Sequence, residues 1–131
     1  MIGVDDKMDI AFQKIFDILS DNVSDDWQKI VLYAEYGEGS YLIKYFVKTS
    51  TGKYIDCYAF DFLDERKLNK VFSNINNIIA PARKEASPKD LWYVMTMIVD
   101  DTGHFRTEYE YEDISEHSID YYMEWKKKYL V

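Results

Sequence analysis

Residues 29–60 read KIVLYAEYGEGSYLIKYFVKTSTGKYIDCYAF, and this stretch contains three apolar runs rich in β-branched and aromatic side chains. Two short polar segments with glycine, Gly37-Glu38-Gly39 and Thr49-Ser50-Thr51-Gly52, separate the runs. Segments of this kind form tight turns between paired strands. We therefore expect an antiparallel meander of three strands, at residues 29–36, 41–48 and 53–60.

Helical periodicity appears on both sides of the meander. Across residues 5–22 apolar side chains recur every three or four positions, which is typical of an amphipathic helix. After the meander, Asp64 is a suitable N-cap for a second helix that keeps this spacing as far as Pro81. A third helix is expected near the end of the chain, capped by Ser115 or Ser118, with three lysines in its last turn.

Two more strands are expected between the second and third helices. Residues 91–99 form an apolar run, residues 105–113 alternate in polarity, and Asp100-Asp101-Thr102-Gly103 between them reads as a hairpin turn. The sequence thus predicts an α+β fold, in which an antiparallel sheet of about five strands packs against helices. The expected order along the chain is α-β-β-β-α-β-β-α, within a single domain over residues 1–131.

The last expected strand combines aromatic and acidic side chains. Residues 105–113 read FRTEYEYED. Successive side chains of a strand point to opposite faces, so Glu108, Glu110 and Glu112 would share one face and the aromatic residues the other. Neighbouring like charges repel each other, which suggests that something positive docks there. A solvated strand face in an acidic protein is the competing interpretation.

The charge of the whole chain restricts the partners that it can attract. The formal net charge is −8 and the sequence pI is about 4.7. This excess repels nucleic-acid phosphates and anionic membrane surfaces, so we expect neither direct nucleic-acid binding nor membrane binding. A basic protein is the complementary partner, although solubility alone would also account for the charge.

Cysteine usage and the N-terminal sequence indicate the compartment. Cys57 is the single cysteine, so it cannot form an internal disulfide, and its apolar neighbours favour a buried, inert thiol. The first residues show no basic region followed by an apolar core, and no later segment approaches a membrane-spanning length. We therefore expect a cytoplasmic protein; its oligomeric state stays open.

Motifs for catalysis or metal binding are weak. Asp101-Thr102-Gly103 matches the short signature of aspartic proteases, which could complete a carboxylate dyad in a homodimer, but the supporting second segment is missing. The two histidines, His104 and His117, lack ligand-like spacing with Cys57. No phosphate-binding glycine loop or dinucleotide fingerprint occurs. We expect no catalytic residue, no cofactor and no metal.

Several strings in this order resemble the YezG-like family of bacterial immunity proteins, or antitoxins. They are DDWQKI at residues 25–30, MTMIVD at 95–100, GHF at 103–105, YEYEDIS at 109–115 and YMEWKKKYL at 122–130. The resemblance spans nearly the whole chain and is strongest in its last third. It implies a non-enzymatic cytoplasmic protein that binds and neutralises a cognate secreted toxin, commonly a nuclease-type domain.

Charge pattern and resemblance together suggest a binding surface. Because a nuclease cleft must hold phosphates, it is usually positive, and an acidic inhibitor can cover it. Our candidate partner-binding residues are the following acids, with Tyr111 as an aromatic anchor unless it is buried beside Tyr109: Asp100, Asp101, Glu108, Glu110, Glu112 and Asp113. Two alternatives remain: an acidic regulatory module with another basic partner, and a dimeric aspartic-type hydrolase that uses Asp101.

Overall fold

The computed structural model describes residues 4–131 and confirms the α+β fold and the expected order of elements. Three α-helices and five strands make up the chain. The helices are α1 (Val4–Ser20), α2 (Glu65–Lys84) and α3 (Ser118–Tyr129). The strands are β1 (Trp27–Gly37), β2 (Ser40–Thr49), β3 (Tyr54–Asp56), β4 (Val94–Asp100) and β5 (Phe105–Glu110).

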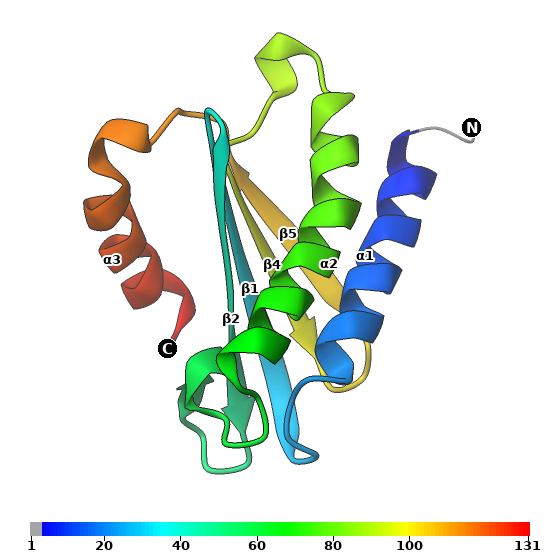
Figure 1. Ribbon diagram of the computed structural model, residues 1–131, viewed down its shortest axis with the longest axis vertical. Coiled ribbons are helices and arrows are strands. Elements are labelled where there is room, and N and C mark those ends of the chain that lie inside the picture. Colours follow the sequence, from blue (N-terminus) through cyan, green and yellow to red (C-terminus); the bar gives the residue numbers. More distant parts are fainter. Residues whose placement is uncertain (1–3) are drawn as a thin grey trace.

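The five strands form one antiparallel sheet in the spatial order β3-β2-β1-β4-β5 (Figure 1). The predicted meander of β1, β2 and β3 is confirmed, and β4 pairs with the free side of β1. The long strand β1 is therefore central, while β3 and β5 are the two edges.

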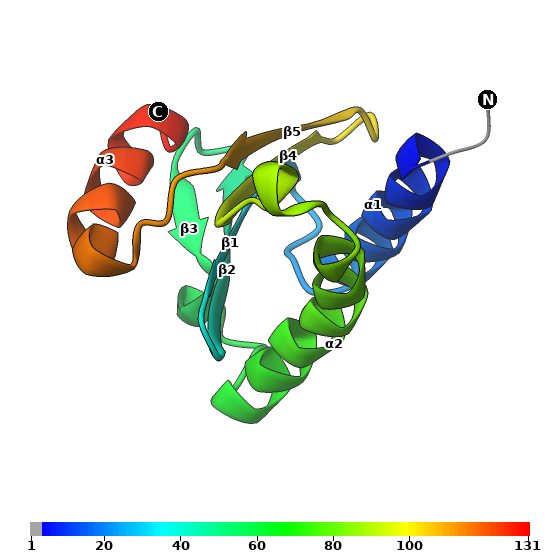
Figure 2. The same ribbon diagram turned by 90° about the horizontal axis from the view of Figure 1, so that it is seen from above.

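Helices cover both faces of this sheet, as the view from above shows (Figure 2). The pair α1 and α2 lies on one face and α3 lies on the other. Successive side chains of a strand point to opposite faces, and the central strands β1 and β4 are buried at most positions. Both faces of these strands are therefore apolar. The sequence predicted the helices but not their division between two faces.

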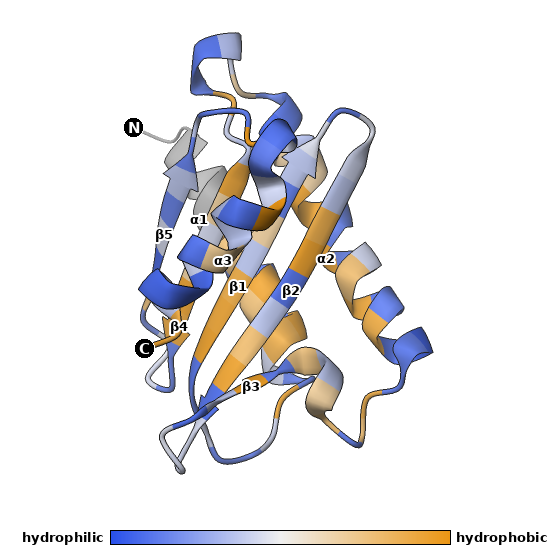
Figure 3. Cartoon of the chain, turned by 90° about the vertical axis from the view of Figure 1, so that its left-hand side faces the viewer, coloured by the Kyte–Doolittle hydropathy of each residue, from blue (hydrophilic) through white to orange (hydrophobic). Residues whose placement is uncertain are grey.

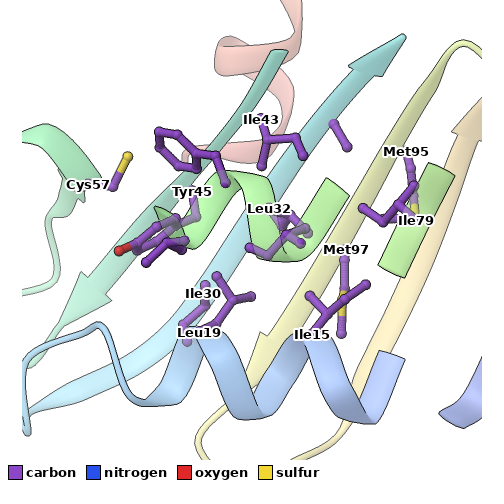
Figure 4. Close-up of a cluster of buried hydrophobic side chains, with 14 of the residues drawn as sticks. Ile15, Leu19, Ile30, Leu32, Ile43, Tyr45, Cys57, Ile79, Met95 and Met97 are labelled. Carbon is purple, nitrogen blue, oxygen red and sulfur yellow. The ribbon is translucent and has the colours of Figure 1, made fainter. Parts of the chain in front are cut away.

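The larger core lies between the sheet and the helices α1 and α2 (Figure 4). Alternate residues of the central strands point into it, and the apolar stripes of both helices pack against them. Its fully buried members include Ile15, Leu19, Ile30, Leu32, Leu68, Ile75, Met95 and Met97. This core makes the sheet a rigid support for whatever its edges and other face carry.

A smaller core lies beneath α3. The intervening residues of β1, Val31 and Tyr33, join Phe46, Ile98 and Trp125 there. The Trp125 ring packs edge-on against Tyr33 with their centroids 4.7 Å apart. Aromatic contacts of this geometry add to the stabilisation from burial, so α3 is docked by side chains on the face opposite α1 and α2.

Strand β3 is shorter than predicted. It ends at Asp56, and residues Cys57–Ala59 form a 3₁₀ helix instead of continuing the strand to residue 60. The Asp56 carboxylate accepts a hydrogen bond from the backbone N–H of Tyr58, at 3.0 Å, and so caps this turn. A local side-chain cap thus replaces the strand hydrogen bonds.

Helix α2 begins as predicted but ends later. Asp64 is its N-cap and accepts a hydrogen bond from the backbone N–H of Lys67 at 2.8 Å. The helix continues past Pro81 to Lys84. The extra turn is held from outside, because Nε of Arg83 donates to the carbonyl oxygen of Trp92 at 2.7 Å.

The segment between β5 and α3 differs from expectation in two ways. Strand β5 ends at Glu110, so residues 111–113 lie beyond it. A short 3₁₀ helix, Ser115–His117, precedes α3, and neither Ser115 nor Ser118 caps α3 with a side-chain hydrogen bond. Within the described residues, no helix has both the length and the apolar character needed to span a membrane.

Candidate functional site: an acidic surface at the β5 edge

The largest local excess of negative charge in this protein lies in one segment. Residues 100–124 contain nine carboxylates and one arginine, a formal charge of −8 that equals the net charge of the whole chain. The other residues therefore carry equal numbers of acidic and basic side chains. We call residues 100–124 the acidic segment; it comprises the β4–β5 turn, β5, the connection to α3 and the first half of α3.

Glu108 and Glu110 point to the face of the sheet that carries α3. The register pairs Glu110 with Val94, and Val94 in turn pairs with Glu35 of the central strand. The backbones of Glu35 and Glu110 are thus about 10 Å apart on one face. Both glutamates are partly exposed at the flank of α3.

Tyr121 of α3 lies beside these two glutamates. Burial, together with the nearby charges of Glu110 and Glu35, raises the pKa of its hydroxyl to about 12. Tyr121 therefore stays neutral near physiological pH. Its position shows that the flank of α3 with Tyr121 faces β5.

The charge of Glu108 is partly neutralised by Arg106 of the same strand. An oxygen of its carboxylate lies 3.5 Å from a terminal nitrogen of Arg106, and both side chains are substantially exposed. Exposed pairs of this kind contribute little to stability, because water and salt screen them. The Glu108 carboxylate is available to a stronger cationic group.

The acids of the β4–β5 turn have separate roles. Asp100 accepts hydrogen bonds from the backbone N–H groups of Thr102 and His104, at 2.9 and 3.1 Å, and from the Thr102 hydroxyl. The Thr102 hydrogen bond is the main cause of the lowered pKa of Asp100. Asp101 is exposed in the same turn. Asp100 therefore shapes the turn, and Asp101 presents its charge to solvent.

The protease-like motif lies entirely in this exposed turn. Gly103 has φ +88°, a left-handed conformation that favours glycine, and its N–H donates to the carbonyl oxygen of Asp100 at 3.0 Å. The interpretation of Asp101-Thr102-Gly103 as a hairpin turn is confirmed. Its glycine serves the turn between two paired strands.

Glu112 does not lie on the strand face predicted for it, and Asp113 likewise lies beyond the end of β5. Glu112 is exposed beyond the end of β5, and its N–H donates to the Glu110 carboxylate at 3.3 Å. Asp113 accepts hydrogen bonds from the N–H and the hydroxyl of Ser115, which lower its pKa. Glu112 is thus near Glu110 in space, whereas Asp113 stabilises the turn that leads to α3.

Tyr111 is exposed and does not enter the core with Tyr109. Its side chain is 54% exposed, and its ring lies against that of Tyr109 with the centroids 6.2 Å apart. Tyr109 in turn packs on the buried Trp92. An aromatic ring supported in this way is a suitable contact residue beside the acids.

The structure adds acids that the sequence did not single out. Glu35 joins the site through strand order, and Glu116 lies exposed in the connection to α3. Asp120 and Glu124 lie four residues apart on the solvent-exposed side of α3. A count of charges along residues 100–124 would have revealed all of these except Glu35.

The gathered groups lie on an exposed surface. Across the described part of the chain, no three His, Cys, Asp or Glu side chains are arranged to hold a metal ion. Two cavities adjoin the acidic segment: one of about 410 Å³ at the β4–β5 turn, lined by Lys29, Asp100 and Arg106 among others, and one of about 230 Å³ lined by Glu35, Ile114 and Ser115 among others. The hydropathy view shows hydrophilic colours along β5 and on much of the outer side of α3 (Figure 3).

A three-layer α+β fold that concentrates its net charge at one sheet edge defines a small acidic protein whose candidate site is a surface. The chain belongs to the YezG-like family of immunity proteins, because the model of that family matches residues 8–130. The chain is also 26% identical over 122 residues to the immunity protein YezG of Bacillus subtilis (strain 168). That alignment covers 88% of this chain and 80% of the relative.

Proposed function

We propose that this protein binds and neutralises a cognate toxin of the nuclease type through its acidic segment. Membership of an immunity protein family supports the general role. The location of the charge supports the choice of surface, because residues 100–124 alone account for the net charge of −8. Outside this segment acids and bases balance in sum, so solubility alone does not explain why nine carboxylates and one arginine gather here.

A nuclease is the toxin class that best complements this surface. Its cleft must attract phosphates, so it presents lysine and arginine side chains to an approaching anion. Carboxylates on a rigid sheet edge compete for the same groups, and charge complementarity can raise the association rate by roughly tenfold to a thousandfold. An inhibitor needs rapid capture when the toxin and its target share the cytoplasm. A cytoplasmic location also agrees with the single, reduced Cys57.

The residues of the surface divide into two roles. Asp101, Glu108, Glu110 and Glu112 supply the charge that the toxin meets, and Tyr111 supplies an exposed aromatic contact among them. Asp100 and Asp113 accept backbone hydrogen bonds, and so hold the turns on either side of β5 in place. Loss of the first group should weaken binding, whereas loss of the second should loosen the surface itself.

Matched charge removal tests the proposal. The triple variant Glu108→Gln, Glu110→Gln, Glu112→Gln is titrated calorimetrically against the toxin encoded beside this gene, at low and high salt. The control variant Asp21→Asn, Asp25→Asn, Asp61→Asn removes the same charge at exposed positions outside the acidic segment. We expect the first variant to lose at least about tenfold in affinity and much of its salt dependence, and the control to bind nearly as the wild type.

The same experiment can reject the surface. Equal affinity and equal salt dependence for both triple variants would remove the β5 edge from the interface. The nuclease assignment is tested separately, by whether the toxin degrades DNA or RNA and whether the protein stops that degradation. A toxin with another activity would overturn the nuclease proposal while leaving the acidic surface in place.

A further inference from the structure

The outer edge of β5 is open. Among the described residues, no strand pairs with that side of β5, and the view from above shows no element beyond it (Figure 2). The strand has six residues, contains no proline, and keeps a continuous register with β4. The other edge, β3, has only three residues and runs directly into a 3₁₀ helix. An open edge of this length is a template for another strand.

The hydrogen bonds show which backbone groups point outward. The N–H of Asp100 donates to the carbonyl oxygen of His104 at 3.0 Å, so His104 belongs to a hydrogen-bonded pair with β4. Such pairs alternate along an antiparallel ladder. In the continuous register, Arg106, Glu108 and Glu110 follow His104 in bonding toward β4. The backbone N–H and C=O groups of Phe105, Thr107 and Tyr109 therefore face outward.

The side chains at this edge define what an incoming strand must carry. Glu108 and Glu110 point to the α3 face, while Phe105 and Tyr109 pack against the larger core on the other face. Residues opposite the glutamates would occupy the non-hydrogen-bonded positions, where side chains approach most closely. Opposite charges are favourable there and like charges are unfavourable. The complementary strand alternates basic and apolar residues.

We infer that β5 accepts a strand from the toxin, with alternating basic and apolar side chains, as a sixth strand of this sheet. The inference rests on the proposed function and specifies how its partner docks. Backbone hydrogen bonds would provide affinity, and the glutamates would select a cationic strand over a neutral or acidic one. The same glutamates protect the edge in the free protein, because charged side chains discourage unselective strand pairing.

A second copy of this chain is a poorer occupant of the edge. Pairing two β5 strands about Thr107 would bring Arg106 opposite Glu108 of the other copy, which is locally favourable. It would also bring together two acidic segments, each with a formal charge of −8. This repulsion favours a cationic partner. We therefore expect the protein alone to sediment as a monomer with an open β5 edge.

Hydrogen exchange resolved by residue tests the inference. In the free protein, the outward amides of Phe105, Thr107 and Tyr109 should exchange faster than the inward amides of Arg106 and Glu108. Saturation with the toxin encoded beside this gene should slow the outward amides at least about tenfold. Unchanged exchange in a saturated complex would overturn the inference and leave the proposed function standing. A mixture that forms no complex would overturn both.

A proline variant separates backbone pairing from simple coverage. Thr107→Pro removes an outward N–H that bonds nothing within the sheet, and proline is tolerated at such edge positions. Thr107→Ala is its control. We expect Thr107→Pro to lose at least tenfold more affinity for the toxin than Thr107→Ala, with similar circular dichroism. Equal affinities of Thr107→Pro and Thr107→Ala for the toxin would overturn strand pairing. A free protein that forms a dimer with slowly exchanging outward amides would overturn it as well. If Thr107→Pro does not fold, the hydrogen-exchange experiment tests the inference instead.

Discussion

Trp125 of α3 donates a hydrogen bond from its indole Nε1 to the hydroxyl of Thr96 on β4, over 2.8 Å, and each residue is only 3% exposed. This contact joins two residues that are 29 positions apart in the chain. It fixes α3 over the middle of the sheet, in a core of aliphatic and aromatic side chains. Since the acidic segment continues into α3, the placement of its last carboxylates depends on this contact.

Replacing one partner of this hydrogen bond should be costly. We expect Thr96→Val to lower the free energy of unfolding by about 1–3 kcal/mol, because the buried indole N–H loses its acceptor. In a Trp125→Phe background, the same substitution should cost much less. Urea unfolding of the wild type, the two single variants and the double variant measures these free energies. If Thr96→Val costs the same in both backgrounds, the hydrogen bond is not the source of the lost stability.

The Lys44–Asp56 pair should stabilise the fold within a defined pH range. Nζ of Lys44 on β2 lies 2.8 Å from Oδ2 of Asp56 on the neighbouring strand β3. For Lys44, burial opposes the charged form, but the hydrogen bond that it donates to the Asp56 carboxylate, helped by the nearby Tyr122 hydroxyl, outweighs burial and raises the pKa above 10.5. For Asp56, burial is likewise outweighed by Lys44 and the Tyr58 N–H, and the pKa falls below 3.8.

The directions of these two pKa shifts determine how the stability contributed by the pair varies with pH. Asp56 stabilises the fold above pH 3.8, and this contribution is lost as the pH falls through its lower folded pKa. Lys44 stabilises below pH 10.5, and its contribution is lost as the pH rises through its higher folded pKa. We expect Asp56→Asn to cost up to about 1 kcal/mol at neutral pH and less at both extremes. A cost that does not vary with pH in urea titrations would contradict this account.

Cys57 should be unreactive in the folded protein. Its side chain is fully buried, and burial raises its pKa from 9.0 to about 11. The thiolate population near neutral pH is then lower by roughly a hundredfold, before access is considered. We expect alkylation by iodoacetamide to require unfolding. Ala59→Cys in a Cys57→Ala background, at an exposed position of the same turn, is the reactive control; equal rates would contradict burial.

Substitutions at the neighbouring residues Glu112 and Asp113 should affect different properties, toxin binding for Glu112 and stability for Asp113. Glu112→Gln should slow association with the toxin and leave the midpoint of thermal unfolding unchanged, because Glu112 is exposed. Asp113→Ala should lower that midpoint by a few degrees, because the Ser115 N–H and hydroxyl lose their acceptor. Asp113→Asn keeps an acceptor and should restore the midpoint. Stopped-flow binding and thermal scans measure both effects; identical phenotypes would refute the division of roles.

Much of this fold could be predicted from local patterns. The turns at residues 37–39 and 49–52, the N-cap at Asp64 and the apolar spacing of the helices depend on neighbouring residues alone, and all occur as expected. The departures came from competing interactions. The Asp56 cap ended β3 early, and the contact of Arg83 with Trp92 carried α2 past Pro81. The second is tertiary, so no local rule contains it.

The site was predictable in composition and not in arrangement. The acidic and aromatic alternation of residues 105–110 led to β5. Glu35 could not be connected with Glu110 before the order β1-β4-β5 was known. Nor could the sequence show that α3 lies on the glutamate side of the sheet, since an amphipathic helix packs equally well on either apolar face.

The electroneutrality of the chain outside residues 100–124 bears on how such a protein can diversify. If this stretch binds the toxin as proposed, substitutions at its exposed acids would change the choice of toxin, while the buried residues of the two cores need not change. Recognition and architecture are therefore free to evolve at different speeds within a single small polypeptide.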